Sequence, residues 1–448
     1  MERTMNKPVL VQLKSKVSDI ARSRAVGRVI STDGHTIRIA GLEEEARLGD
    51  RLRLFRSDGT SLTGDVLCLS GDGVTMLPDG PPQRVALGDR VTLSGRVRIF
   101  PDTSWLGRVI DPFGQPLDGA PLISGPSGLE IDNDPPMGGH RKPLGARLQT
   151  GFHLFNTILP IVRGQRVGIF AGAGVGKSTL LANLMQSIEA DVVVLALVGE
   201  RSREINDFTQ IVLREDRLCR VVVVAASADA APSTRLRCPI TAMRLAEFFR
   251  DAGQHVLLFV DSVTRFAEAH REVAATAGEF PSLRGFPPST PAQISKMAER
   301  AGPGLTGTGD ITAIFNVLVA ASDMNEPVAD MLKGVLDGHF VLDRKLADQG
   351  RFPAVNILQS VSRSLPEAAD SGENDLIVRA RRLVAKYEGS LPLIEAGLYS
   401  AGTDTQLDQA IAFHGNFSDF ALSRVTCTIA ESFAALRLCL LRCGALKD

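Results

Sequence analysis

Residues 167–184 of the chain read VGIFAGAGVGKSTLLANL. The apolar run Val167–Phe170 is typical of a buried strand, residues 179–184 are typical of a helix, and small residues with glycine join the two. The order strand, glycine loop, helix is the context that a P-loop requires. Backbone N–H groups of such a loop surround phosphate oxygens, and the helix N-terminus adds partial positive charge. The stretch therefore predicts a loop that holds the phosphates of a nucleotide.

Residues of this loop have predicted roles in binding ATP and Mg²⁺. Lys177 would neutralise the β- and γ-phosphates, and the Ser178 hydroxyl would ligate Mg²⁺. The first position of the general pattern, usually glycine, is Ala171, whose methyl group is compatible with a negative φ. The predicted nucleotide-binding residues of the loop are Gly172, Ala173, Gly174, Val175, Gly176, Lys177, Ser178 and Thr179.

Two further apolar runs end in carboxylates. Val256–Val260 is followed by Asp261, and Val192–Val198 is followed by Gly199 and Glu200. Next to a P-loop, an aspartate at the end of a buried strand is predicted to hold Mg²⁺ through a water molecule. Glu200 could polarise the attacking water in a hydrolysis reaction. In isolation, the carboxylates read as a helix cap at Asp261 and a solvated side chain at Glu200.

The composition is that of an ordinary globular protein. Of 448 residues, 44% are hydrophobic and 23% charged, and the formal net charge of −1 creates no global attraction to nucleic acid or membranes. No apolar run approaches the ~20 residues that a membrane span needs, and residues 1–16 lack the apolar region of a signal peptide. The cysteines form no Cys-x-x-Cys pair, which favours reduced thiols in the cytosol over disulfides or zinc.

The hydrophobic pattern divides the chain into four predicted segments. Residues 1–24 predict a basic amphipathic helix that either packs on its own domain or frays in solvent, or else docks on a partner or an anionic membrane. Residues 25–99 alternate short β runs with Asp-Gly turns, which is typical of a small antiparallel barrel. Residues 100–365 alternate apolar strands with helical stretches, which predicts an α/β core with a mostly parallel sheet and helices on both faces. Residues 366–448 predict a C-terminal helical domain.

Longer segments resemble the family that contains the rotary ATP synthase α and β subunits and the type III protein-export ATPases. The resemblance covers residues 25–440 in order. It is carried by Leu106–Asp111 with Gly114–Gly119, Gly164–Arg166, Gly199–Glu204, Pro353–Asn356 and Ser360–Arg363. It implies a RecA-like ATPase core with ATP and Mg²⁺ as cofactors.

The resemblance implies catalytic roles for several charged residues. Glu200 would polarise the lytic water, with Arg201 and Arg265 near the γ-phosphate. Arg363 would be an arginine finger supplied by the neighbouring subunit, which implies sites between identical subunits. Without the resemblance, Arg363 reads as a surface arginine in a loop.

The resemblance also implies an aromatic contact with the adenine base. Phe352 falls where the family places an aromatic ring, usually tyrosine, and phenylalanine keeps the stacking face. Tyr399 is a second candidate for the same pocket. A core phenylalanine is the other interpretation of Phe352.

Within the family, the chain is most similar to the export ATPases of flagella and injectisomes. This similarity is carried by Phe170–Gly172, Asp261–Ala267, Gly285–Ser289, Ile311–Phe315 and Asp323–Asp330. The presence of both Lys177 and Glu200 argues against a non-catalytic subunit. Ser322 departs from the branch, which often has an acidic residue there.

Similarity to that branch implies a homohexameric ring whose ATP hydrolysis releases proteins from chaperones, unfolds them and drives their export. Within the branch, the flagellar export ATPase is the preferred interpretation. The implied partners are stalk and regulator proteins of the export apparatus, chaperone–substrate complexes and the export gate. The implied location is cytoplasmic, peripheral at the inner face of the bacterial cytoplasmic membrane. The loop Gly285–Ser289 would face the central opening of the ring.

Two other functions stay open from the sequence alone. A catalytic subunit of a proton-translocating ATP synthase would share these motifs but would need a different partner subunit. An RNA-translocating hexamer of the transcription-terminator type would carry stacking aromatic and basic residues on its barrel. The barrel region and its border offer Phe55, Phe100 and Trp105, so we expect no nucleic-acid partner.

Overall fold

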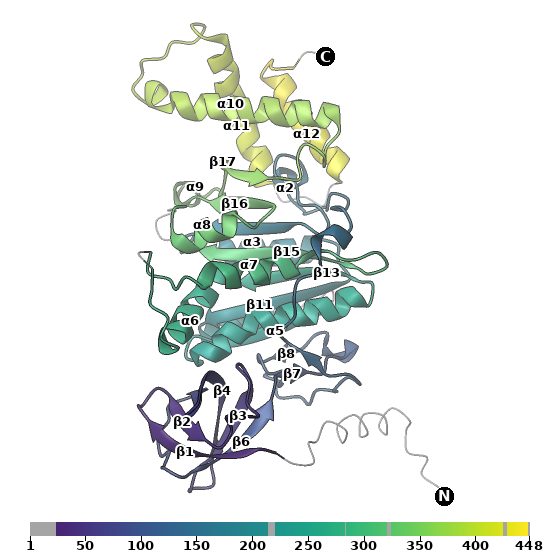
Figure 1. The fold of residues 1–448 in the computed structure, drawn as a ribbon. Coiled ribbons are helices and arrows are strands. Elements are labelled where there is room, and N and C mark those ends of the chain that lie inside the picture. Colours follow the sequence, from purple (N-terminus) through teal and green to yellow (C-terminus); the bar gives the residue numbers. More distant parts are fainter. Residues whose placement is uncertain (1–23, 214–219, 283, 320–323, 424–427, 447–448) are drawn as a thin grey trace, which may run out of the picture. The chain divides into compact units, whose positions relative to one another are not determined.

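The computed structural model describes residues 24–213, 220–282, 284–319, 324–423 and 428–446 (Figure 1). The basic helix predicted for residues 1–24 falls almost wholly outside these ranges, and so does the departure at Ser322. The strands and helices below are those of the described residues.

The N-terminal strands close into an antiparallel β-barrel in the order β1-β2-β5-β4-β3-β6 (Figure 1). These strands are β1 (Val26–Thr32), β2 (Ile37–Ala40), β3 (Arg51–Phe55), β4 (Ser61–Ser70), β5 (Gly73–Pro78) and β6 (Arg90–Gly95). In β3 the side chains of Leu52 and Leu54 are buried while their neighbours face outward. This alternation gives the barrel one apolar interior, as the sequence predicted.

The middle of the chain forms an α/β core. Its first elements are β7 (Arg98–Ile99), β8 (Val109–Ile110), β9 (Leu129–Glu130), α2 (His153–Asn156), β10 (Arg166–Ala171), α3 (Lys177–Ser187), β11 (Val192–Glu200), α4 (Ser202–Leu213), β12 (Val221–Ser227) and α5 (Pro232–Asp251). They are followed by β13 (His255–Asp261), α6 (Val263–Thr276), α7 (Thr290–Arg300), β14 (Gly302–Pro303), β15 (Asp310–Leu318), α8 (Pro327–Lys333), β16 (Gly338–Leu342), α9 (Arg344–Asp348) and β17 (Val355–Ser362).

Most strands of this core pair in the order β17-β16-β10-β15-β13-β11-β12-β8, and β14 lies beside β15. β7 and β9 are not part of this sheet and form an antiparallel pair of their own. β10 pairs in parallel with both β15 and β16, whereas the terminal strand β17 runs antiparallel to β16. Nearly every residue of β10, β11 and β13 is buried, as expected for strands covered on both faces. The predicted parallel sheet is therefore confirmed.

The chain ends in the helices α10 (Ser371–Glu395), α11 (Thr405–Leu422) and α12 (Ile429–Arg442). Capping boxes begin two of them, with Asp370 and Glu373 at α10 and Thr428 and Glu431 at α12. The apolar face predicted from Ile377, Ala380, Leu383 and Val384 is buried. The predicted C-terminal helical region is therefore confirmed.

The chain forms two compact units, each built from several stretches of the sequence. The first unit consists of the residues up to Pro135, Val194–Phe248 and Val260–Met297. The second takes Pro136–Val193, Phe249–Phe259 and the chain from Ala298 onward. The barrel thus belongs to the first unit, and the P-loop and the C-terminal helices belong to the second.

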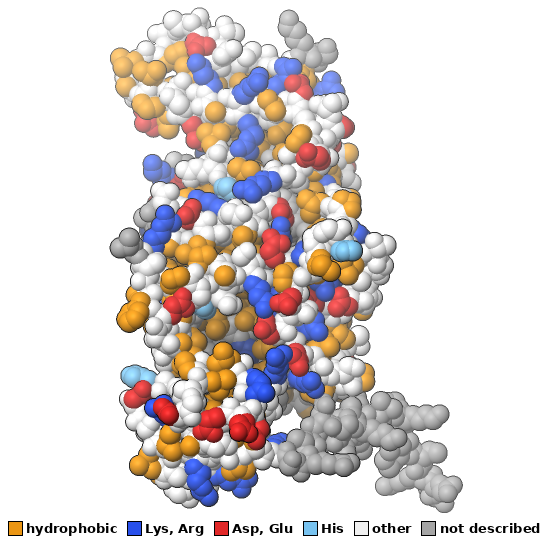
Figure 2. Space-filling model, viewed as in Figure 1, with side chains coloured by type: hydrophobic (Ala, Val, Ile, Leu, Met, Phe, Trp, Pro, Cys, Tyr) orange, Lys and Arg blue, Asp and Glu red, His pale blue; other side chains and the backbone are white. Residues whose placement is uncertain are grey.

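The surface carries charges of both signs. Figure 2 shows Lys and Arg side chains interspersed with Asp and Glu on the face in view. This agrees with the net charge of −1. Among the helices of the described ranges, none is long and apolar enough to cross a membrane.

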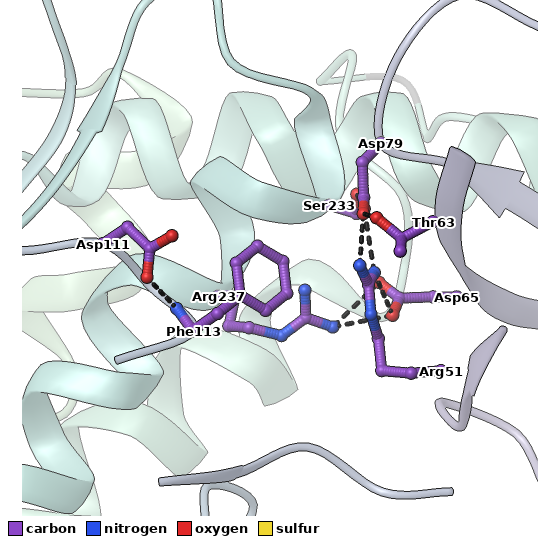
Figure 3. A network of polar contacts seen from close by, with 8 residues as sticks. All are labelled: Arg51, Thr63, Asp65, Asp79, Asp111, Phe113, Ser233 and Arg237. Carbon is purple, nitrogen blue, oxygen red and sulfur yellow. Dashed lines mark hydrogen bonds and ion pairs between the residues drawn. The ribbon is translucent and has the colours of Figure 1, made fainter. Parts of the chain in front are cut away.

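Within the first unit, a network of ion pairs joins the barrel to α5 (Figure 3). Asp65 of β4 accepts hydrogen bonds from Arg51 of β3 at 2.9 Å and from Arg237 of α5 at 2.8 and 2.9 Å. Arg51 also pairs with Asp79, and the ring of Phe113 lies 4.6 Å from the Arg51 guanidinium and 4.7 Å from that of Arg237. The side chains of Asp65, Arg51 and Arg237 are only 9–13% exposed. Water therefore screens the attraction between their charges only weakly.

We expect Asp65→Asn to lower the free energy of unfolding by about 3 kcal/mol, because it leaves two partly buried guanidinium groups short of a carboxylate. Urea denaturation followed by circular dichroism measures the change. Asp72→Asn is the matched control, because the Asp72 side chain is 90% exposed and lies 3.6 Å from Arg38. Its effect should stay within about 0.5 kcal/mol. Equal losses in both variants would contradict the stabilising role of the network.

Candidate nucleotide site

The predicted P-loop follows β10, the strand between β15 and β16. Ala171, its last residue, lies opposite Leu318 of β15 and Leu342 of β16, and its carbonyl accepts a hydrogen bond from Val319 N at 3.1 Å. Among the described residues, Arg84 is the only non-glycine residue with a positive φ. Ala171 therefore has ordinary strand geometry, which an alanine adopts without strain.

The loop turns through glycines and leads directly into α3. Gly174 and Gly176 have φ values of 77° and 81°, in the left-handed region that favours glycine. Gly176 caps α3, and its carbonyl accepts the first helical hydrogen bond from Leu180 N at 3.0 Å. Lys177 and Ser178 then occupy the first turn of α3, and the first turn of a helix is suited to binding an anion.

A cavity of about 390 Å³ adjoins the loop and the start of α3 within the second unit. It is lined by Phe152, Gly174, Gly176, Thr179, Leu180, Asn183, Phe352, Pro353 and Leu422. A Cβ atom added to Gly176 would lie 2.8 Å from Cδ1 of Phe352, so the aromatic ring lies directly against the loop. A mostly apolar cavity with an aromatic wall beside a phosphate-binding loop suits a purine base.

The two aromatic residues predicted for this pocket lie in different places. Phe352 lines the cavity, and the residue is 49% exposed. Tyr399 is not among the described residues that line it, and its hydroxyl instead donates a hydrogen bond to Asp408 at 2.7 Å. Leu422, the last residue of α11, does line the cavity, and the sequence reasoning missed it. Its local pattern is that of any apolar helix residue, so only the tertiary fold assigns it to the pocket.

In the first unit, Glu200 and Asp261 each end a strand, β11 and β13. Asp261 is only 6% exposed, and the next residue, Ser262, caps α6 by accepting a hydrogen bond from Arg265 N at 3.4 Å. A Cβ atom added to Gly199 would lie 3.3 Å from Cβ of Arg265. The residue before Glu200 therefore packs against the helix that follows Asp261, and the ends of the two strands are neighbours.

Both arginines predicted to lie near the γ-phosphate belong to this first unit and reach solvent. The Arg201 side chain is 83% exposed and lies 3.7 Å from Glu204. The Arg265 side chain is 44% exposed and lies 2.9 Å from Glu268. Each guanidinium is thus paired with a carboxylate three residues further along the chain, at the start of α4 for Arg201 and within α6 for Arg265. Such exposed ion pairs contribute little stability.

Arg363, the predicted arginine finger, follows β17 in the second unit. Its backbone N donates to the carbonyl of Asp337 at 2.8 Å, and its Nη2 donates to the carbonyl of Lys333 at 3.4 Å. The residue is exposed and is not among the described residues that line the cavity. A hydrogen bond thus holds the Arg363 backbone, and the residue itself is exposed to solvent.

The two residues predicted to hold magnesium each carry an oxygen donor. Ser178 offers an exposed hydroxyl at the start of α3, and Asp261 offers a buried carboxylate at the end of β13. Hydroxyl and carboxylate oxygens are the ligands that Mg²⁺ prefers, with water completing its shell. Among the described residues, no cluster of three His, Cys, Asp or Glu side chains could hold another metal, and the described cysteines are free.

The P-loop on a parallel sheet, the base-sized cavity beside it and the carboxylates at strand ends define the chain as a P-loop nucleotide-hydrolysing protein. Its barrel precedes this core, and its helical region follows it. Comparison with known proteins narrows that class.

Residues 151–362 match the ATP synthase alpha/beta family nucleotide-binding domain, and residues 370–437 match the T3SS EscN ATPase C-terminal domain. The flagellum-specific ATP synthase of Agrobacterium fabrum is 42% identical over 385 residues, which cover 86% of this chain and 80% of that protein. The assembled ATPase EscN of enteropathogenic E. coli has a TM-score of 0.85 at 32% identity, covering 92% of this chain and 100% of EscN. EscN in complex with its central stalk EscO has a TM-score of 0.83 at 33% identity, with the same coverage.

The chain belongs to the family of the flagellum-specific ATP synthases and type III secretion ATPases, and it is an ATPase. The predicted resemblance to the export branch is thereby confirmed. The relatives do not favour the alternative of a rotary ATP synthase subunit.

We expect Gly176→Ala to weaken ATP binding at least about tenfold, because the new methyl group meets both a left-handed backbone and the Phe352 ring. Isothermal titration with MgATP measures the affinity. Gly389→Ala is the control, since Gly389 lies in α10 with nothing within 4 Å of the added atom. That change should raise stability by about 0.5–1 kcal/mol and leave ATP affinity unchanged. Full ATP affinity in Gly176→Ala would show that the loop does not hold the nucleotide.

Proposed function

We propose that this chain hydrolyses MgATP as a homohexameric ring, and that hydrolysis drives chaperone release, unfolding and export of proteins through a type III apparatus of the flagellar kind. The observation that carries the proposal is the glycine loop packed against Phe352, with a base-sized cavity beside it. The family membership supports the export role, and the assembled form of the relative EscN supports a ring.

The residues around the loop divide the work of binding and hydrolysis. Backbone N–H groups of Gly172–Thr179 and the Lys177 ammonium bind the β- and γ-phosphates. Ser178 would hold Mg²⁺ directly and Asp261 would hold it through water, and the ion would supply positive charge that compensates the phosphates. Glu200 orients and polarises the water that attacks the γ-phosphate. A partly exposed carboxylate at a strand end suits that role because water reaches it.

Arginines complete the charge compensation. Arg201 and Arg265 move from their neighbouring carboxylates to the γ-phosphate, an exchange that their exposure allows. Arg363 acts on the site of the next subunit, because it is exposed and does not line the cavity of its own unit. An arginine supplied in this way is worth ~10³–10⁵ in rate.

The export role implies partners beyond the ring. EscN forms a complex with its central stalk EscO, and we propose a stalk partner of the same kind here, with a regulator, chaperone–substrate complexes and a membrane export gate. The loop Gly285–Ser289 is the proposed contact with the opening of the ring. Ser289 holds one end of it, donating from its backbone N and its hydroxyl to Glu279 at 2.8 and 2.6 Å. The location we propose is the cytoplasmic side of the membrane, beneath that gate.

A complementation experiment tests the shared site. Lys177→Ala, Glu200→Gln and Arg363→Ala should each lose nearly all ATPase activity while remaining folded. A mixture of Lys177→Ala with Arg363→Ala should recover activity, because about a quarter of randomly formed interfaces combine an intact loop with an intact finger. Phosphate release measures the recovery.

The control mixture combines Lys177→Ala with Glu200→Gln. Both residues act within one subunit in the proposed mechanism, so no interface of this mixture is complete and activity should stay at the background level. Recovery in the control, or its absence in the first mixture, would contradict the assignment of Arg363 to the neighbouring subunit. Full activity of Lys177→Ala alone would remove the mechanism altogether.

A further inference from the structure

The residue before Phe352 connects the base cavity to the C-terminal helices. Arg351 donates a hydrogen bond from Nη2 to the Ser418 hydroxyl of α11, and the same nitrogen lies 3.4 Å from Nε2 of His414, also on α11. Its backbone N donates to the carbonyl of Leu346 at 3.0 Å. One side chain thus ties the segment that carries Phe352 to a helix that lies far along the chain.

His414, one of the two α11 residues that Arg351 contacts, is itself held by an aromatic neighbour. The ring of Tyr387 in α10 stacks on His414, with 3.8 Å between centroids and 12° between planes. Burial and the nearby charge of Arg351 hold the pKa of His414 below its ordinary value, which favours the neutral ring, and Nε2 of a neutral ring can accept a hydrogen bond from Arg351. The Arg351 contact is therefore built on two of the C-terminal helices.

Helical spacing connects this contact to the base. His414, Ser418 and Leu422 lie four residues apart and share one face of α11. Leu422 lines the base cavity from this face, and Phe352 and Pro353, which follow Arg351, line it as well. A smaller cavity of about 70 Å³, lined by both Arg351 and Leu422, lies against the same residues. The guanidinium thus links the two walls that a base would contact.

We propose that Arg351 is a positioning residue for the nucleotide base: its contact with α11 fixes Phe352 and Leu422 as opposite parts of one clamp. This inference rests on the proposed function, in which the adenine of ATP occupies the cavity. It follows that a partner that displaces α11 changes nucleotide affinity rather than the rate of the chemical step. The C-terminal helices would then control how tightly each subunit of the ring holds its nucleotide.

Arg351→Met keeps much of the side-chain length and removes the hydrogen bonds to α11. It should raise KM for MgATP about tenfold while kcat stays within about twofold, because the clamp contributes to binding and not to phosphoryl transfer. Arg351→Lys should restore part of the affinity, since an ammonium still donates to Ser418. Ser418→Ala, a smaller change, should raise KM about threefold.

Arg344→Met is the matched control, because the Arg344 side chain on α9 is 73% exposed and lies 3.8 Å from Asp348. Its KM should equal that of the wild type. Inorganic tripolyphosphate serves as a probe that reaches the P-loop but has no base. Its inhibition constant should be the same for wild type and Arg351→Met, whereas a general loss of structure would raise it together with KM.

These measurements distinguish the inference from the function on which it rests. Absence of turnover in the wild type would contradict the proposed function, and calorimetric binding of ATP and tripolyphosphate would still test the clamp. An unchanged ATP affinity in both Arg351→Met and Ser418→Ala, or equal losses for ATP and tripolyphosphate, would overturn the role of Arg351.

Discussion

The packing of Phe352 against Gly176 is the contact on which the candidate site depends. It favours glycine at position 176, because an added Cβ atom would lie 2.8 and 2.9 Å from two ring atoms and the backbone φ there is 81°. It also places an aromatic face beside the start of α3, where phosphates bind. The pairing of β10 with two parallel neighbours holds the strand that leads into the loop.

Arginine side chains perform the same structural task in several places. Arg51 and Arg237 share the carboxylate of Asp65 and connect the barrel with α5. In the second unit, Arg147 pairs with Glu373 at 2.9 Å and lies 5.0 Å from the ring of Phe433. A planar guanidinium offers donors in several directions and a face for an aromatic ring, so one residue can join three segments. Arg351 fits this pattern at the nucleotide site.

Sequence patterns predicted the parts of the molecule that depend on local chemistry. The glycines of the loop, the Asp-Gly turns of the barrel and the apolar strands each have a cause within a few neighbouring residues. Leu422 and Arg351 have no such local cause, since their roles arise where α11 meets the segment before β17. Tyr399 is the opposite case: its sequence position suggested a contact with the base, whereas its hydroxyl donates a hydrogen bond to Asp408. The boundaries of the two compact units were likewise not visible in composition or spacing.

A tryptophan at position 352 gives the most direct test that a nucleotide base stacks on this residue. The chain's single natural tryptophan, Trp105, is 2% exposed and donates to the carbonyl of Ile123 at 2.6 Å, so its fluorescence supplies a constant background. In Phe352→Trp, MgATP should quench the added emission in a saturable manner, whereas tripolyphosphate should not. Emission that stays unchanged while the variant hydrolyses ATP would contradict the placement of the base.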